Sequence, residues 1–196
     1  MTRLLLALAG AALSTATLVG DPIKEATCKS CPATYIGNEE LQQYHQRAVA
    51  QKIIDQQVRS VDVGKSNVAV GYVHRTRIEK PGEVAEHDHV SEVYHVISGS
   101  ATLVTGPDLL GAERRPATNT NVRLLNGPGH NAASIRNGVT HQLKRGDVVI
   151  IPAGTGHWFT KIDDHITYLM IRVDPDKMTP LKDEAASKAD LAGKKQ

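Results

Sequence analysis

Short apolar runs separated by turn residues fill most of this chain, from about residue 57 to residue 174. They are rich in β-branched and aromatic residues, which favour strands, and the clearest are 68–78, 101–105, 139–143, 148–151, 157–161 and 166–173. Turn signals at Pro81-Gly82, Gly99-Ser100 and Asp163-Asp164 separate them. Many short strands with this punctuation predict an all-β barrel or sandwich.

The first twenty residues have the pattern of an export signal. Arg3 is followed by an apolar run over 4–13, and the small residues Ser14 and Ala16 come next. Ten apolar residues are too few to cross a bilayer, and no later stretch reaches the roughly 20 required. We therefore expect residues 1–20 to be a signal peptide, the protein to be periplasmic or secreted, and no membrane span.

Net charge and aromatic content argue against a nucleic-acid partner. The formal net charge is +2, and the chain has a single Phe and no basic block with interleaved aromatic residues. Cys28 and Cys31, the two cysteines, are predicted to form a local disulfide or a flexible pair of thiols. A second cysteine pair for zinc is missing, and Pro32 stands where attached haem would require histidine.

Segments of helical character flank the strand-rich region. Residues 21–56 are predicted to be a linker followed by a helix that begins near Asn38, with an apolar face of Leu41, Tyr44, Ala48, Val49 and Ile53. Residues 175–196 are charged and alanine-rich. They predict a polar tail that is partly helical, from about 181 to 191, or disordered.

The segment 83–99 concentrates the chemistry of the chain. It contains His87, His89, Glu92 and His95 among β-branched residues. Histidines at i and i+2 of a strand point to the same side, and a carboxylate just beyond them completes a donor set for zinc or another divalent transition metal. Glu92 shares a strand face with Tyr94, whereas His95 lies on the opposite face, so we favour Glu92 over His95 as the ligand.

A second segment, 146–161, combines a glycine turn, an apolar strand, a Pro-Ala-Gly corner and a histidine. Gly146, Pro152, Gly154 and His157 match the second motif of the cupin superfamily at every interval, and Lys161 replaces its final asparagine. The two segments together therefore resemble cupins.

The first cupin motif is present in residue types, with two intervals one residue short. Gly82, His87, His89, Glu92 and Gly99 supply its members. The short intervals are those from Gly82 to His87 and from His89 to Glu92. The second is a two-residue link that demands a tight turn or a bulge.

The resemblance implies a fold and a metal site. The fold is a double-stranded β-helix (cupin or jelly-roll barrel) over residues 57–174, with one N-terminal helix and a charged C-terminal tail. The implied ligands are His87, His89, Glu92 and His157, around Mn, Fe, Zn, Ni or Cu. Three imidazoles and one carboxylate leave positions open for water or substrate. Cupins also often dimerise, so a homodimer is possible.

Function is predicted only as a class. The first hypothesis is an exported cupin that acts on, or binds, a small oxygen-rich molecule. As an enzyme it would be a dioxygenase- or oxidase-like oxidoreductase, or else a lyase or isomerase. The alternative is a non-catalytic metal- or ligand-binding protein of the storage or stress type. A third hypothesis, metal-free isomerisation by a His-acid pair, would leave activity intact after chelation.

Several residues are candidates for the walls of the pocket. Tyr94, Trp158 and Phe159 are possible walls, although each also suits the barrel core. The irregular stretch 106–138 is an insertion of the kind that often forms a binding loop or a lid. Within it we expect His130 to be a solvated loop residue.

Overall fold

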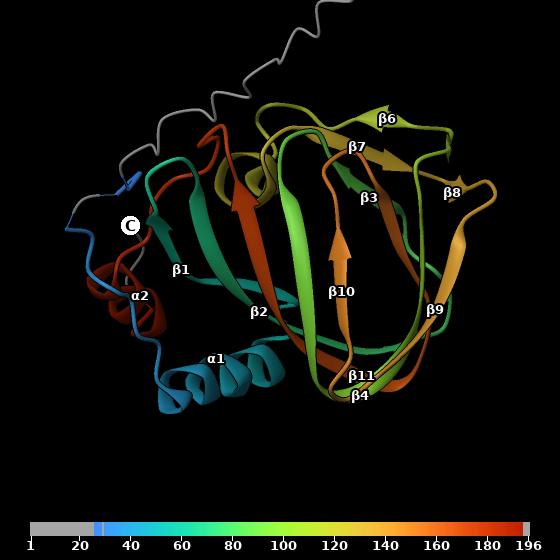
Figure 1. Ribbon diagram of the computed structural model, residues 1–196. Helices are drawn as coiled ribbons and strands as arrows, with labels where there is room; N and C mark the ends of the chain where they lie inside the picture. Colours follow the sequence, from blue (N-terminus) through green and yellow to red (C-terminus); the bar gives the residue numbers. More distant parts are fainter. Residues whose placement is uncertain (1–25, 29, 194–196) are drawn as a thin grey trace, which may run out of the picture.

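The computed structural model describes residues 26–28 and 30–193, so the predicted signal peptide, residues 1–20, lies outside the described residues. The described part forms mostly antiparallel strands, with one helix near each end (Figure 1). The elements are α1 (Asn38–Gln51), β1 (Asp55–Asp62), β2 (Asn67–Ile78), β3 (Val84–His87), β4 (Ser91–Gly106), β5 (Leu109–Leu110), β6 (Glu113–Arg114), η1 (Val122–Asn126), β7 (Gly129–Ala132), β8 (Ser134–Ile135), β9 (Val139–Lys144), β10 (Val148–Ile151), β11 (Gly156–Asp174) and α2 (Glu184–Leu191).

Two long strands, β4 and β11, run through the whole barrel. They pair antiparallel from Gly106 opposite Gly156 to Ser91 opposite Val173. At one end the pair is flanked by β2 and β10, and at the other end by β3 and β9. The same two strands therefore belong to two sheets, ordered β1-β2-β11-β4-β10 and β9-β4-β11-β3-β7-β6.

The two sheets face each other (Figure 1), and the main core lies between them. Buried side chains from both halves of the long strands meet there, including Tyr94, Leu103, Phe159 and Ile166. This arrangement is a double-stranded β-helix, and the fold class predicted from the sequence is confirmed. No helix in the described part of the chain is long and apolar enough to cross a membrane.

Two places that the sequence predicts as turns are bends inside the long strands. Gly99 lies within β4 and Asp163-Asp164 within β11, so both turn predictions were wrong. Gly99 pairs with Ile166, next to a register shift in β11. Its φ is +77°, and a Cβ there would collide with the carbonyl group of His165. Glycine at this position lets the paired strands bend together without separating.

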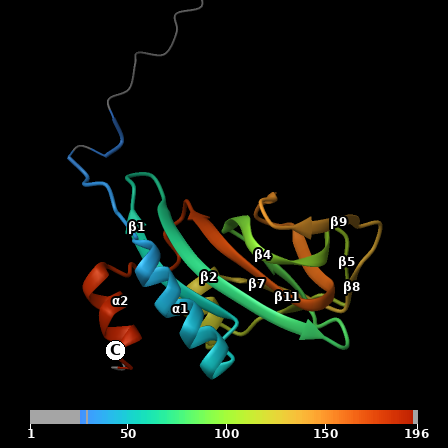
Figure 2. The same ribbon diagram turned by 90° about the horizontal axis from the view of Figure 1, so that it is seen from below.

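Helix α1 packs on the outer surface of the first sheet (Figure 2). Tyr44 and Ala48 are buried as predicted, and Tyr44 contacts Val58 and Tyr72 in a second, smaller core. Val49 does not belong to this face, because its side chain is 55 % exposed.

Helix α2 is docked against the same region. Its N-cap Asp183 accepts a hydrogen bond from the Ala186 backbone, Ser187 is fully buried, and Leu191 packs on the smaller core. The side chain of Arg47 in α1 holds Asp190 through two nitrogens, at 2.9 and 3.1 Å. Of the two alternatives predicted for this part of the tail, helical or disordered, the structure has the helix, over Glu184–Leu191. Capping and ion pairs fix a helix that has few large apolar residues.

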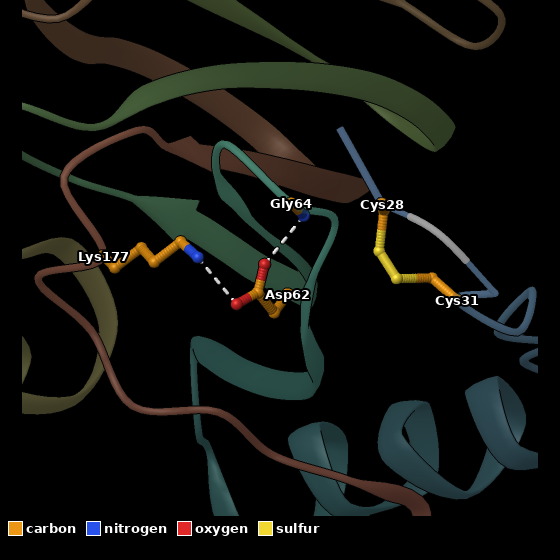
Figure 3. The surroundings of a disulfide bond; sticks show 5 residues. All are labelled: Cys28, Cys31, Asp62, Gly64 and Lys177. Atoms are coloured by element: carbon orange, nitrogen blue, oxygen red, sulfur yellow. Dashed lines mark hydrogen bonds and ion pairs between the residues drawn. A yellow bond between two sulfur atoms is a disulfide. The ribbon is translucent and has the colours of Figure 1, made fainter. Parts of the chain in front are cut away.

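The N-terminal segment lies against the turn between β1 and β2 (Figure 3). Cys28 and Cys31 form a disulfide. In the adjacent turn, Asp62 accepts hydrogen bonds from the Gly64 amide (2.7 Å) and from Lys177 (2.6 Å). A Cβ on Gly64 would lie 2.6 Å from the carbonyl oxygen of Thr27. Glycine at this turn therefore permits the close approach of the segment that carries the disulfide.

The core between the two sheets should be sensitive to truncation. Leu103 is fully buried in β4, so Leu103→Ala should lower the free energy of unfolding by about 2–5 kcal/mol. Val139→Ala, on the neighbouring strand β9, is the matched control. Its side chain is 61 % exposed, and the change should cost less than about 0.5 kcal/mol. Urea denaturation measures both, and equal losses would contradict the proposed core.

Candidate metal centre

Three predicted ligands converge between the two sheets. His87 ends β3, Glu92 lies near the start of β4, and His157 is the second residue of β11. Ala85 of β3 pairs with His157, which brings His87 to the same end of the second sheet. Glu92 pairs with Arg172 in the first sheet and faces them. Each of the three ligands offers one donor atom, and these atoms lie within 4.8 Å of one another.

The distances fit a shared cation. His87 Nε2 lies 3.4 Å from Glu92 Oε1, and His157 Nε2 lies 3.5 Å from Glu92 Oε2. These separations exceed the usual hydrogen-bond range of about 2.7–3.2 Å. They match two ligands of one ion at metal–ligand distances of about 2.0–2.2 Å, which lie about 3.0–3.5 Å apart. The donor set, two imidazoles and one carboxylate, suits zinc or another divalent transition metal.

Glu92 is held as a carboxylate. Burial by itself raises its pKa, but His87, His157 and Arg172 together hold the pKa well below its usual range. The Tyr94 hydroxyl donates to Oε2 at 2.7 Å, and Arg172 forms an ion pair with Glu92, with Nε 3.4 Å from Oε1. Arg172 is itself fixed by Gln57 and Asp55. A metal ligand must be deprotonated and orientated, and this network provides both.

His157 is prepared as a neutral ligand. Burial lowers its pKa to about 4, against the opposing effect of Glu92. Its Nδ1 lies 3.3 Å from the carbonyl oxygen of Thr155 and can donate to it. A proton on Nδ1 leaves the lone pair of Nε2 directed at the cluster, which is the usual arrangement of a ligating histidine.

His89 is not brought to this group. Strand β3 ends at His87, and the chain turns before β4 begins at Ser91, so the alternation that would align His87 with His89 is interrupted. The His89 ring is 42 % exposed, and its Nδ1 lies 2.7 Å from Asp176. The two-residue link before Glu92 is accommodated by this turn. The four-ligand set stays a prediction, and the structure assembles three of its members.

The predicted strand parity is confirmed. Glu92, Tyr94 and Val96 are buried, whereas His95 is exposed. Tyr94 also lines the pocket described below.

The other two possible wall residues lie elsewhere. Phe159 packs in the core against Tyr94, and Trp158 lies on the other face of β11, where its indole N–H donates to the Gly82 carbonyl at 2.7 Å. Neither of them lines the pocket.

A cavity of about 520 Å³ opens onto the three ligands. Beside them, its polar lining includes Lys52, Asp55, Arg75, Glu83, Tyr94, Arg115, Asn121, Asn126, Asn131 and Tyr168. A larger hollow of about 850 Å³ lies between α1 and α2 and contains none of the cluster residues. The size and mixed polarity of the smaller cavity suit a small polar ligand.

The insertion, residues 106–138, contributes side chains to the site. Its strand β7 pairs with β3, and Arg115 reaches the Glu86 carbonyl and His87 Nδ1, the latter at 2.9 Å. Sequence reasoning overlooked Arg115, Arg75 and Arg172. For Arg172 a signal exists, because it is the single charged residue of the run 166–173, ITYLMIRV.

The contact with Arg115 determines a tautomer. A guanidinium can only donate, so His87 Nδ1 accepts and, in the neutral ring, the proton is on Nε2. Metal binding through Nε2 needs the opposite tautomer. Arg115 and a metal ion therefore compete for His87.

A second group of acidic and histidine side chains lies on the outer side of β3. His130 donates through its backbone and ring nitrogens to Glu86, at 3.1 and 2.8 Å, and Arg114 donates to Asp88 at 2.7 Å. His130 is thus a strand residue in an ion-pair cluster, and its predicted place in a solvated loop was wrong. These contacts pair the acidic groups with protein donors, so the cluster is explained without a metal.

The two motif segments meet in one barrel, which gives this chain the cupin fold. No family model matches the chain, and no curated protein matches it. Similar solved structures include the BH2720 protein of Bacillus halodurans, with 15 % identity over 82 % of this chain and 96 % of that one and a TM-score of 0.42. An RmlC-like cupin from Methanocaldococcus jannaschii has 13 % identity over 63 % and 84 %, with a TM-score of 0.37. The DMSP lyase DddQ from Ruegeria pomeroyi has 17 % identity over 65 % and 49 %, with a TM-score of 0.38.

Alanine variants test the ligand set. His157→Ala should weaken Zn²⁺ binding by more than about 100-fold, since removal of an outer-shell partner alone costs 10–100-fold. His89→Ala is the matched control and should change the affinity by less than about threefold, because its ring lies apart from the cluster. Competition with a chromogenic chelator measures both affinities. An equally large loss in His89→Ala would restore the four-ligand set.

Arg115 should oppose metal binding. Arg115→Gln removes the donor to His87 Nδ1 and a positive charge, so the affinity for Zn²⁺ should rise by about tenfold or more. Arg114→Gln removes an adjacent charge that is bound to Asp88 and should have a much smaller effect. The same competition assay applies, and weaker binding in Arg115→Gln would contradict the competition.

Proposed function

We propose that this protein is an exported cupin that binds a divalent transition metal through His87, Glu92 and His157. At that centre it acts on, or binds, a small oxygen-rich molecule. The observation that carries the proposal is the donor set itself. Two buried imidazoles and a buried carboxylate, with spacings that suit one ion, face a cavity of about 520 Å³.

A bound metal would act as a Lewis acid toward an oxygen atom of the ligand. The protein's own residues supply position and charge. Arg172 and Tyr94 hold Glu92 in place, and Thr155 orientates His157. The amide side chains of Asn121, Asn126 and Asn131 line the cavity and offer hydrogen bonds to a polar ligand.

Metal identity would direct the choice of reaction class. A redox-active ion such as Fe or Mn favours oxidase or dioxygenase chemistry, and Zn or Ni favours lyase or isomerase chemistry. A metal centre without an exchangeable water would favour the storage or stress type of protein instead.

Export is proposed from the signal-like residues 1–20. The disulfide between Cys28 and Cys31 supports it, because disulfides persist mainly in oxidising compartments. Fractionation of cells that produce the full chain tests this part of the proposal, and a protein found uncleaved in the cytoplasm would contradict it.

Metal removal and return test the centre. Binding at 1,000 times the Kd stabilises the folded state by about 4 kcal/mol. A change of that size should raise the midpoint of thermal unfolding by roughly 8 °C or more. We expect chelator-treated protein to show this rise with one equivalent of metal bound, and His157→Ala to show neither effect. Elemental analysis and calorimetry are the measurements. No metal in the purified protein and none bound after addition would end the proposal.

A further inference from the structure

Arg75 is a cavity residue with an unusual environment. It projects from β2, its guanidinium lies 5.0 Å from the centre of the Phe159 ring, and its Nε donates to the Tyr168 hydroxyl at 3.2 Å. Tyr168 packs on Tyr94, which donates to Glu92. A wall of two tyrosines thus connects Arg75 to the metal ligands.

The terminal nitrogens of Arg75 have no protein partner in the described part of the chain. Buried and partly buried arginines elsewhere in that part form ion pairs with carboxylates: Arg47 with Asp190, Arg59 with Glu40 and Arg172 with Asp55. Arg75 and Arg115 form none, and both line the same cavity. A guanidinium that loses water needs another partner, and the paired terminal nitrogens match the two oxygens of a carboxylate.

The charge balance of the cavity also favours an anionic ligand. Its lining cations, Lys52, Arg75 and Arg115, equal its lining carboxylates in number. Each of those carboxylates already has a partner: Asp55 has Arg172 at one of its two oxygens, Glu83 has Asn131, and Glu92 has the proposed metal centre. A divalent ion would therefore leave an excess of positive charge, which an anionic ligand offsets.

A second polar group of the cavity, the side-chain amide of Asn126, could accept a hydrogen bond from the ligand. Asn126 lines the cavity, is 9 % exposed, and its side-chain oxygen has no hydrogen-bond partner among the residues that the structure describes. An unpaired buried acceptor costs free energy that a ligand hydroxyl can recover.

We propose that the ligand of this cavity is a small hydroxycarboxylic acid. Arg75 binds its carboxylate through the terminal nitrogens, and Asn126 accepts a hydrogen bond from its hydroxyl group. This assignment rests on the proposed function, because it names the class of molecule that reaches the same metal centre.

Calorimetric titrations of the zinc-loaded full chain test the assignment. Glycolate, lactate and malate are the acidic probes, and lactamide is the neutral counterpart of lactate. At least one acid should bind. Arg75→Gln should weaken it by about tenfold to a hundredfold, the range for a hydrogen bond to a charged group, and should leave lactamide unchanged. Arg75→Lys keeps the charge without the paired donors and should give an intermediate loss.

A matched control lies two residues along the same strand. Arg77 pairs with Glu79 at the surface and is 66 % exposed, so Arg77→Gln makes the same charge change outside the cavity and should have no effect. Near-identical thermal unfolding midpoints for the arginine variants would show that each is folded. Binding of no acid by the loaded protein, or equal acid affinities in wild type and Arg75→Gln, would overturn the assignment.

The two proposals fail in different ways. If the wild-type protein takes up no metal, the metal centre is wrong. The titrations on metal-free protein then still decide the role of Arg75, since a tenfold loss supports it and equal affinities overturn it. If metal binds normally and Arg75→Gln binds the acids as wild type does, only the assignment of the ligand is wrong.

Discussion

The antiparallel pairing of β4 with β11 is the constraint on which the rest of this barrel depends. Because both strands bend at the same place, each contributes to both sheets. The bend turns the sheets toward each other, so Glu92 in one sheet comes to face His87 and His157 in the other. The polar centre is thus a consequence of the same geometry that closes the apolar core.

Two arginines near this centre, Arg172 and Arg75, differ in how many of their donors have a partner within the protein. Arg172 is matched within the protein, with Asp55, Gln57 and Glu92 as partners. It holds Glu92 in place and, after His87 and His157, helps to keep the pKa of Glu92 low. Arg75 is not matched in this way. Arg172 therefore helps to build the site, whereas the terminal nitrogens of Arg75 stay available to a ligand in the cavity.

Sequence reasoning succeeded where one local rule decided the outcome. Strand parity separated Glu92 from His95, and the burial pattern of β4 agrees with it. The second motif pointed to His157, which lies beside Glu92 only in the folded chain, and its role as a metal ligand stays a prediction. The same parity rule did not bring His89 to the cluster, because the strand that it assumes ends at His87. The bends at Gly99 and Asp163-Asp164 have the composition of turns, and only long-range pairing distinguishes a kink from a turn.

For a related reason, local sequence rules could not identify the arginines of the cavity. Arg75 and Arg115 lie in segments whose sequence resembles ordinary strand ends and loops. What they share is the cavity and the lack of a carboxylate partner among the described residues, and both are properties of the assembled fold.

The donors of the proposed metal centre come from both sheets, and this has a mechanical consequence. An ion at this point would join the two sheets across the mouth of the barrel, opposite the bend that already joins them through the backbone. The sheets could then separate only after an ion–ligand bond had broken. Occupancy of the centre would therefore lengthen the lifetime of the folded state, and the protein would resist opening for as long as it kept its metal.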